Sequence, residues 1–267
     1  MKVSVITVTR NAVNTLERTI LSVLGQDYNH RELIIIDGNS TDGTLDIIRK
    51  HESSIDYWIS EPDRGIYHAM NKGIAVARGD WINFLNAGDV YSSMNILSRI
   101  MESVTENNDV VYGDSITKYP HFHVLRKAGK PEHLWKGMSI CHQSIWFRSS
   151  LARNLLFQEE YHLGADYNLL IQLYKTGASF HYLPIAMTIV DPGGISNRMM
   201  WRSAMEHLKI SRQHLKLSSG QRFQQYCMIA ILTYISMIRL ILPEHVYQSL
   251  LFRYRHNSIV PLHHLPE

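Results

Sequence analysis

The sequence predicts an α/β protein with a doubly wound mixed sheet and a helical C-terminal extension. In residues 1–90, short apolar runs alternate with segments whose apolar residues recur at helical spacing. This is the pattern of parallel strands joined by right-handed crossovers. From 91 to 198 the strand-like pieces are broken by Gly and Pro, which indicates mixed strands packed beside the first half. Residues 199–267 favour helices, and a chain of 267 residues with 45% hydrophobic content can bury a large core.

The first half contains the clearest elements. A buried strand is expected at 3–9, and a second apolar run at 33–36 ends in Asp-Gly, as central parallel strands do. Two shorter strands are expected at 57–59 and 81–85. Helices are predicted between 13 and 24, after the capping residues Ser40, Thr41 and Asp42, and from Tyr67 to Ala77.

The second half and the tail are less regular. Strands are expected at 110–112, 123–125 and 144–147, followed by a helix at 166–175, and the chain beyond Ser196 is predicted to be wholly helical. Tyr226–Leu242 is nearly all apolar but is marginal in length for a membrane span. Three interpretations stay open: a buried or dimer-forming helix, an interfacial helix flanked by arginines at 222, 253 and 255, and, least favoured, a transmembrane helix.

Charge and cysteine content narrow the function classes. The 27 basic and 24 acidic residues are spread along the chain, so nucleic-acid binding is not indicated. Only Cys141 and Cys227 are present, which suits a reducing compartment. Met1–Ile6 alternates into a strand and lacks the pattern of a signal peptide. We therefore expect a cytoplasmic protein.

Polar residues follow three of the predicted strands, where open α/β sheets bind ligands. These segments are Thr7–Asn11, Asp37–Thr44 and Asn86–Asp89. No GxGxxG follows the first strand and no GxxxxGK[ST] is present, which removes the main support for a dinucleotide or P-loop protein. A nucleotide of another class is indicated, although Asp42 and Thr44 serve equally well as helix caps.

Four motifs follow one another in the first half. They are Ser4–Asn11, Ile36–Thr44, Glu61–Gly73 and Ala77–Asp89, and a further match runs from His142 to Gly194. Their order and spacing resemble family 2 glycosyltransferases, particularly the branch similar to bacterial colanic acid and exopolysaccharide enzymes. The resemblance implies a GT-A fold and transfer of a sugar from a nucleotide diphosphate donor to a hydroxyl group. It covers 1–198 as a nucleotide-binding half (1–90) and an acceptor half (91–198), and leaves the helical extension uncovered.

The resemblance also implies a donor site. Its residues are Thr7, Thr9, Asn11, Asp37, Asp63, Arg64 and Asn86. Asp37 is expected to accept from the N–H of the base, usually uracil, while Asp63 and Arg64 lie at the sugar and diphosphate. His68 stands where relatives often carry Asp; it either affects the choice of donor sugar or is an exposed residue of the first helical turn.

A metal site is implied at Asn86–Asp89, the position of the family's Asp-x-Asp element. Only the last carboxylate is kept here, so Asp89 is the expected ligand of Mg²⁺ or Mn²⁺, which prefer oxygen ligands. One protein carboxylate can suffice, because Mg²⁺ often keeps several waters. The alternative role of Asp89 is to cap the helix that begins near Ser92.

The expected general base is Asp166, because Gly164–Tyr167 resembles the family's acidic base position. A carboxylate at a helix start is also an ordinary partner of the helix dipole. His142 and Gln143 resemble residues at the edge of the acceptor cavity, although a core histidine is the alternative. The loop Asp191–Ser196, with arginines at 198 and 202, is a candidate to close over the donor.

These expectations combine into an inverting glycosyltransferase, since direct displacement needs no enzyme nucleophile. The expected donor is a UDP-sugar, and the acceptor is a growing surface polysaccharide or a lipid-linked oligosaccharide. Peripheral contact of the C-terminal helices with the inner membrane stays open. Because Asn86 replaces the first carboxylate, a non-catalytic nucleotide-sugar-binding or assembly subunit is the alternative. A sugar nucleotidyltransferase is disfavoured, because Thr7–Asn11 contains no Gly.

Overall fold

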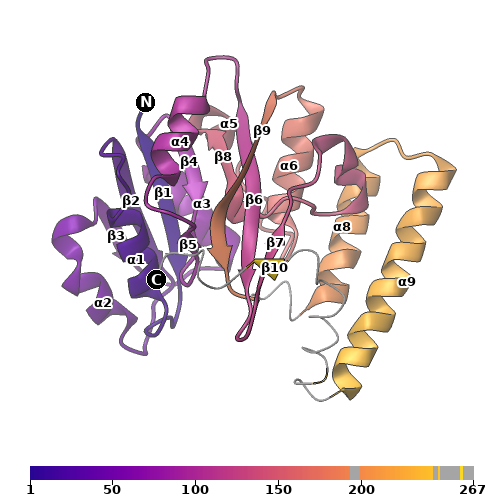
Figure 1. Cartoon of the computed structure of the whole chain (residues 1–267), viewed down its shortest axis with the longest axis horizontal. Helices are drawn as coiled ribbons and strands as arrows, with labels where there is room; N and C mark the ends of the chain where they lie inside the picture. The colour runs from indigo at the N-terminus through magenta and orange to yellow at the C-terminus, as the bar shows by residue number, and fades with distance from the viewer. Residues whose placement is uncertain (193–198, 243–245, 247–258, 261–267) are drawn as a thin grey trace.

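The computed structural model describes residues 1–192, 199–242, 246 and 259–260, and its strands there form one sheet (Figure 1). The strands are β1 (Val3–Thr9), β2 (Arg31–Asp37), β3 (Tyr57–Ser60), β4 (Trp81–Phe84), β5 (Val90–Tyr91), β6 (Val110–Lys118), β7 (His123–Arg126), β8 (Ile145–Arg148), β9 (Phe180–Val190) and β10 (Ile259–Val260). Their order is β10-β7-β6-β8-β4-β1-β2-β3, with β9 paired to β5 and β6.

Helices cover both faces of this sheet. They are α1 (Leu16–Leu24), α2 (Thr44–Lys50), α3 (Ile66–Val76), α4 (Ile96–Ser103), α5 (Ser149–Leu155), α6 (Ala165–Lys175), α8 (Met200–His214) and α9 (Ser219–Ile241), with short 3-10 helices η1 (Glu52–Ser54), η2 (Pro131–Lys136) and η3 (His142–Ser144). Val5 belongs to a core cluster with residues of α1, α2 and α4, while its neighbour Ile6 belongs to a second cluster with residues of α3, α5 and α6. Successive strand residues point to opposite faces, so both faces of β1 are buried and its sequence is a continuous apolar run.

The parallel strands place the polar motifs at one edge. β1 pairs in parallel with β2 and β4, and Thr9 lies opposite Asp37 in the register. β4 ends at Phe84, beside Ile6, so the loop Asn86–Asp89 leaves the sheet at the same edge. All four strands predicted in the first half are present.

The second half continues the same sheet. β8 runs antiparallel to β4, and β6 runs antiparallel to β8. β9, which sequence reasoning missed, pairs in parallel with β6 and antiparallel with β5. Its Pro184 lies where the register with β6 shifts, between Leu183 and Ala186. A proline interrupts a strand pattern and is tolerated at such an irregularity, which explains why the sequence concealed this strand.

The C-terminal region is mostly helical, as predicted. α8 packs on α6 and α9 packs on α8. Ser218 and Gln221 form a reciprocal capping box at the start of α9. The prediction of a wholly helical tail is wrong at β10, where the β-branched pair Ile259 and Val260 adds an antiparallel strand to β7. No helix in the described part of the chain is both long and apolar enough to cross a bilayer.

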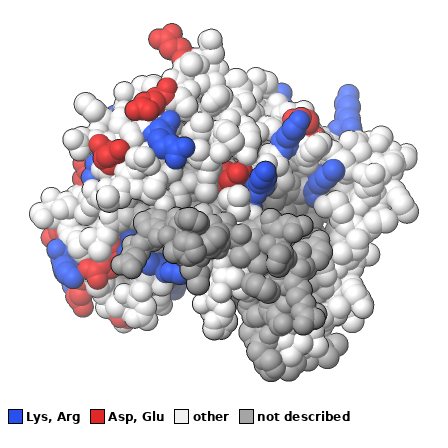
Figure 2. All heavy atoms as spheres, viewed as in Figure 1, with Lys and Arg blue, Asp and Glu red and all other residues white. Residues whose placement is uncertain are grey.

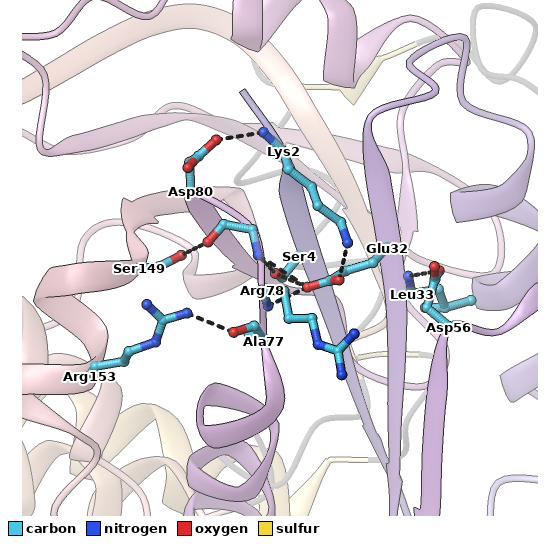
Figure 3. A network of polar contacts seen from close by, with 11 residues as sticks. Lys2, Ser4, Glu32, Leu33, Asp56, Ala77, Arg78, Asp80, Ser149 and Arg153 are labelled. Carbon is cyan, nitrogen blue, oxygen red and sulfur yellow. Dashed lines mark hydrogen bonds and ion pairs between the residues drawn. The ribbon is translucent and has the colours of Figure 1, made fainter.

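The Ala77–Asp80 motif lies at the opposite edge of the sheet, where it takes part in a network of polar contacts (Figure 3). Buried Glu32 accepts hydrogen bonds from Ser4 Oγ (2.6 Å), Arg78 N (2.6 Å) and Gly79 N (3.1 Å), and Lys2 Nζ lies 2.5 Å from it. Burial opposes ionisation of Glu32, but these donors outweigh it and hold its pKa below the usual value. A Cβ on Gly79 would come within 2.6 Å of Ser4 N, so the close approach of the two backbones requires glycine here. The motif therefore has a structural role, at the edge of the sheet away from the polar loops.

Candidate active site

Asp37 organises the loop that follows β2. Its side chain is fully buried; Oδ2 accepts from Ser40 N (2.9 Å) and Ser60 Oγ (2.6 Å), and Oδ1 accepts from Ser40 Oγ (2.5 Å). Asn11 joins this loop to the end of β1, because Asn11 N donates to Ser40 Oγ (2.7 Å) and Asn11 Oδ1 accepts from Thr41 N (2.9 Å). Asp37 and Asn11 thus hold together the loops that follow β1 and β2. Their direct contact with a nucleotide stays a prediction.

Thr7 and Thr9 lie two residues apart on β1 and share a face of the strand. Both hydroxyl oxygens are buried and have no hydrogen-bond partner. Most buried polar atoms are paired, and those that are not are often found where a ligand or a functional group completes the site. This is consistent with the predicted donor site, although no ligand contact is established for either residue.

The side chains of the neighbours Asp63 and Arg64 contact different parts of the protein. Asp63 packs against Gly38, where a Cβ would clash with Asp63 Oδ2, and its Oδ1 accepts from Gly65 N at 2.9 Å. Asp63 therefore lies against the loop after β2, while its contact with a donor stays a prediction. The guanidinium of Arg64 is 72% exposed and pairs with Glu159 at 2.9 Å.

His68 has a local role in this structure. It lies in the first turn of α3, and its Nδ1 accepts from Arg64 N at 3.2 Å. The ring thereby satisfies a backbone N–H ahead of the helix, as a capping side chain does.

Asp89 is the most perturbed carboxylate of the candidate site. It is 8% exposed, and its Oδ2 accepts from Gln143 Nε2 at 2.6 Å. Burial raises the pKa of Asp89 to about 7; the Gln143 hydrogen bond opposes this rise and the charge of Asp191 adds to it. A buried carboxylate that is poised near neutrality is a candidate functional group.

Arg18 ties three parts of the chain together at this point. From α1 its guanidinium hydrogen-bonds the carbonyl of Gly88 and the carboxylate of Asp191, which follows β9. The pairing of β5 with β9 brings Asp191 to this position. The predicted closing loop begins here, but its residues 193–196 and the arginine at 198 lie outside the described residues. Arg202 of α8 lies over the ring of its neighbour Trp201.

A chain of polar contacts runs from the loop after β4 to the first turn of α6. Asn86 Nδ2 lies 3.0 Å from His142 Nε2, and His142 Nδ1 lies 3.5 Å from Asp166 Oδ2. Tyr67 donates its hydroxyl to Asp166 Oδ1 at 3.1 Å. Burial lowers the pKa of His142, and the charge of Asp166 opposes this. A neutral ring that accepts from Asn86 at Nε2 carries its proton on Nδ1, facing Asp166.

Asp166 lies in the first turn of α6, next to apolar side chains. Its Oδ1 also accepts from Tyr167 N at 2.9 Å, so Asp166 does serve the helix start, as the alternative interpretation proposed. A cavity of about 20 Å³ lies behind Asp166 and His142, lined otherwise by apolar side chains: Met70, Phe84, Ile145, Phe147, Phe157, Leu169 and Leu170.

The loop after β4 offers oxygen ligands that suit a hard divalent cation. Asn86 Oδ1 is buried without a hydrogen-bond partner, and the Asp89 carboxylate lies in the same loop. No group of three or more His, Cys, Asp or Glu in the described part of the chain could hold a metal by itself. Mg²⁺ is commonly bound by one or two protein carboxylates together with substrate phosphates, so the residues present fit such an ion.

Residues 4–163 match the family described as Glycosyl transferase family 2. This chain belongs to that family. Among its relatives, a "PGL/p-HBAD biosynthesis glycosyltransferase" of Mycobacterium bovis (strain BCG / Pasteur 1173P2) is 29% identical over 216 residues, which cover 78% of this chain and 84% of the relative. The "GalNAc(5)-diNAcBac-PP-undecaprenol beta-1,3-glucosyltransferase" of Campylobacter jejuni is 26% identical over 249 residues, which cover 85% and 79%.

Solved structures confirm the predicted GT-A fold of this family 2 member. The mannosyltransferase PcManGT from Pyrobaculum calidifontis, solved with GDP-Man and Mn²⁺, matches with a TM-score of 0.64 at 16% identity, over 85% of this chain and 69% of that one. Residues 1–349 of S. aureus TarS, solved with UDP-GlcNAc, match with a TM-score of 0.63 at 16% identity, over 86% and 72%.

The fold joins five of the residues that the family resemblance named and adds three others to their network. Asp89, Asn86, His142, Gln143 and Asp166 are linked by direct contacts, whereas Arg64 is engaged at the surface. The added residues are Arg18, Tyr67 and Asp191. Tyr67 lies inside a family motif, and Asp191 begins the loop that was predicted to close over the donor, whereas Arg18 carried no signal in the sequence.

Proposed function

We propose that this family 2 glycosyltransferase is an inverting, metal-dependent enzyme that moves a sugar from a UDP-sugar to a hydroxyl of a lipid-linked oligosaccharide or a growing surface polysaccharide. One observation carries the proposal. The two adjacent residues His142 and Gln143 connect the loop after β4 to α6, because Gln143 contacts Asp89 while His142 contacts Asn86 and Asp166. The expected metal locus and the expected base are therefore parts of one network.

In the proposed reaction an acceptor hydroxyl attacks the anomeric carbon of the donor as its bond to the diphosphate oxygen breaks. Asp166 takes the hydroxyl proton as general base. Tyr67 and the backbone N–H of Tyr167 both donate to Asp166 Oδ1, which leaves Oδ2 as the oxygen that faces His142. These contacts hold the carboxylate in one orientation, which a general base requires.

Asp89 and Asn86 Oδ1 are the residues that would hold Mg²⁺ or Mn²⁺. When bound, the ion offsets negative charge on the departing diphosphate. Gln143 and Arg18 have supporting roles: Gln143 fixes the Asp89 carboxylate, and Arg18 fixes the backbone of the same loop through Gly88. A nucleotide is expected to lie over the ends of β1 and β2, with Asp63 toward its diphosphate. Thr7, Thr9, Asn11 and Asp37 remain the proposed base and ribose side.

The names of two relatives support this choice of substrates. The Campylobacter relative is named for an undecaprenol-linked acceptor, and the TarS structure contains UDP-GlcNAc. By analogy we assign this chain a UDP-sugar donor and a polyprenyl-linked glycan acceptor. The likeness to enzymes of colanic acid assembly remains an expectation from the motifs.

The test uses purified protein, a panel of labelled UDP-, GDP- and dTDP-sugars, Mn²⁺ and polyprenyl-diphosphate oligosaccharides. We expect UDP-dependent transfer, and NMR of the product should show a β-linkage from an α-linked donor; a retained configuration contradicts the mechanism. Asp166→Asn should lower kcat by about 10²- to 10⁴-fold and leave UDP affinity nearly unchanged. The exposed Glu160→Gln is the matched control.

The non-catalytic alternative rests on Asn86, which stands in place of the first family carboxylate. It predicts metal-assisted binding of the nucleotide sugar without turnover on any acceptor. If the wild type binds UDP-sugar but the Asp166→Asn variant and the wild type show the same negligible turnover, that alternative is preferred.

A further inference from the structure

α9 carries a continuous apolar face that nothing in the described part of the chain covers. Five large side chains on this helix are between 55% and 68% exposed: Phe223, Tyr226, Ile231, Tyr234 and Met237. Their spacing of three to five residues places them along one side of the helix. We call these five residues the α9 stripe. A contiguous apolar surface of this kind on a helix marks an interaction site.

The opposite side of α9 is fixed to the protein. Gln225 is buried, and its Nε2 donates to Trp135 O of η2 (2.6 Å) and to Ser211 Oγ of α8 (2.8 Å). α9 is the outermost helix at this end of the molecule, beyond α8 (Figure 1). The α9 stripe therefore faces away from the glycosyltransferase domain and is presented by an anchored helix.

Basic residues outnumber acidic ones in α8, α9 and the turn between them. Between Met199 and Ile238 there are five basic residues, Arg202, Lys209, Arg212, Lys216 and Arg222, and one acidic residue, Glu206. Of these, Lys209 lies over the ring of Tyr161 and Arg202 over the ring of Trp201, away from the stripe. The Glu206 carboxylate accepts from the backbone N–H groups of His162 and Leu163, so it is directed to the domain and not to the stripe. In Figure 2 the surface at the position of α9 is largely white, neither acidic nor basic.

Two of these basic residues adjoin the stripe itself. The guanidinium of Arg212 lies 4.4 Å from the ring centroid of Tyr226, and Arg222 directly precedes Phe223. An aromatic and aliphatic face bordered by arginines matches the layers of an anionic membrane, in which the acyl chains lie below a plane of phosphates.

We propose that α9 lies flat in the interface of an anionic lipid bilayer, with the α9 stripe among the outer acyl groups and Arg212 and Arg222 at the lipid phosphates. In this arrangement the contact is peripheral. The contact rests on the proposed function only in its purpose, the delivery of a lipid-linked acceptor. α8 joins the two sites, because its His207 packs on Tyr167, next to Asp166, at a ring distance of 4.5 Å.

The test is flotation of the full chain with vesicles of phosphatidylcholine alone or mixed with phosphatidylglycerol. We expect the wild type to float with the anionic vesicles and weakly or not at all with the neutral ones. Phe223→Ser with Tyr234→Ser should lower the partition coefficient at least about tenfold. The matched control is Leu21→Ser with Met94→Ser, which removes exposed apolar side chains elsewhere and should float like the wild type.

A charge variant separates the two parts of the contact. Arg212→Gln and Arg222→Gln should each lower the partition about fivefold, and added salt should remove that difference. The proposal is overturned if the stripe variant floats as well as the wild type, or if the wild type does not float. It is also overturned if light scattering shows a dimer that the stripe variant converts to a monomer, because a second copy then covers the stripe.

Transfer to a water-soluble acceptor analogue distinguishes this proposal from the proposed function. The stripe variant should keep that activity, and equal thermal midpoints should show that it is folded. Loss of flotation with intact transfer leaves the enzyme assignment standing, whereas flotation without any transfer supports the membrane contact alone.

Discussion

Gln143 donates its side-chain N–H to the buried Asp89 carboxylate at 2.6 Å and so joins the segment before β8 to the loop after β4. The two residues are far apart in the sequence, and they meet because β8 pairs antiparallel with β4. Asn83 of β4 strengthens this link, since its Nδ2 donates to Gln143 O (2.9 Å) and Ile145 O (2.8 Å). The acceptor half therefore supports the group that we assign to the metal.

Replacement of Gln143 by Leu should weaken metal binding. The Gln143 N–H lowers the pKa of Asp89, so its loss should raise that pKa further above about 7 and leave less carboxylate at neutral pH. We expect the affinity for Mn²⁺ in the presence of UDP to fall by roughly tenfold or more, as for other partners of metal ligands. Calorimetry between about pH 6 and pH 8 should show the larger loss at the lower pH. Gln224→Leu, on the exposed surface, is the control.

Asp89→Asn should stabilise the metal-free protein while it abolishes metal binding. The pKa of Asp89 is raised from 3.8 to about 7 on folding, so ionisation of this buried group disfavours the folded state above about pH 4. The gain should be on the order of 1 to 4 kcal/mol at pH about 8 and should shrink toward pH 4. Thermal melts across this pH range test it. An Asp46→Asn control, at an exposed site, should change little; a destabilised Asp89→Asn protein contradicts the prediction.

Glu32→Gln should make the fold less stable at neutral pH. The folded-state pKa of Glu32 is lowered, so its contribution is complete above the unfolded value of about 4.5 and is lost as the pH falls through the folded value. We expect a loss of about 1 to 3 kcal/mol near pH 7, because a buried donor set loses its charged acceptor. In chemical denaturation, the gap between wild type and variant should close in acid. If the difference in unfolding free energy between wild type and variant instead grows in acid, the pH dependence has the opposite sign and this explanation is excluded.

Gly79→Ala should be destabilising for a steric reason. An added Cβ would approach Ser4 N within 2.6 Å, and that atom belongs to a backbone that cannot easily move. Gly220→Ala provides the matched control, because its Cβ would meet only Ser218 Oγ at 4.0 Å and alanine favours the helix by up to about 1 kcal/mol. The thermal midpoint should fall for the first variant and stay or rise for the second. Equal midpoints would show that the polar network of Figure 3 can accommodate the added methyl group.

The sequence by itself determined the doubly wound half and the family. β1 and β2 could be predicted because each is buried on both faces and so reads as a continuous apolar run, and the polar residues that follow them mark the ligand-binding edge. The motifs named Asp89 and Asp166 through local patterns that need no knowledge of distant contacts. Local signals failed at β9, whose Pro184 hides the strand, and at β10, whose two residues are too few to form a pattern.

Only the tertiary structure decided how the candidate site is connected. The contacts of Gln143 with Asp89, of His142 with Asp166 and of Arg18 with Asp191 join residues from different strands and helices, and their distances depend on strand pairing that no short sequence window contains. The structure also decided which side of α9 is buried, because the nearly all-apolar stretch from Tyr226 onward carries no internal signal for the side that packs. Local sequence patterns can therefore identify candidate reactive side chains. Packing between distant segments of the chain decides which of these side chains come into contact.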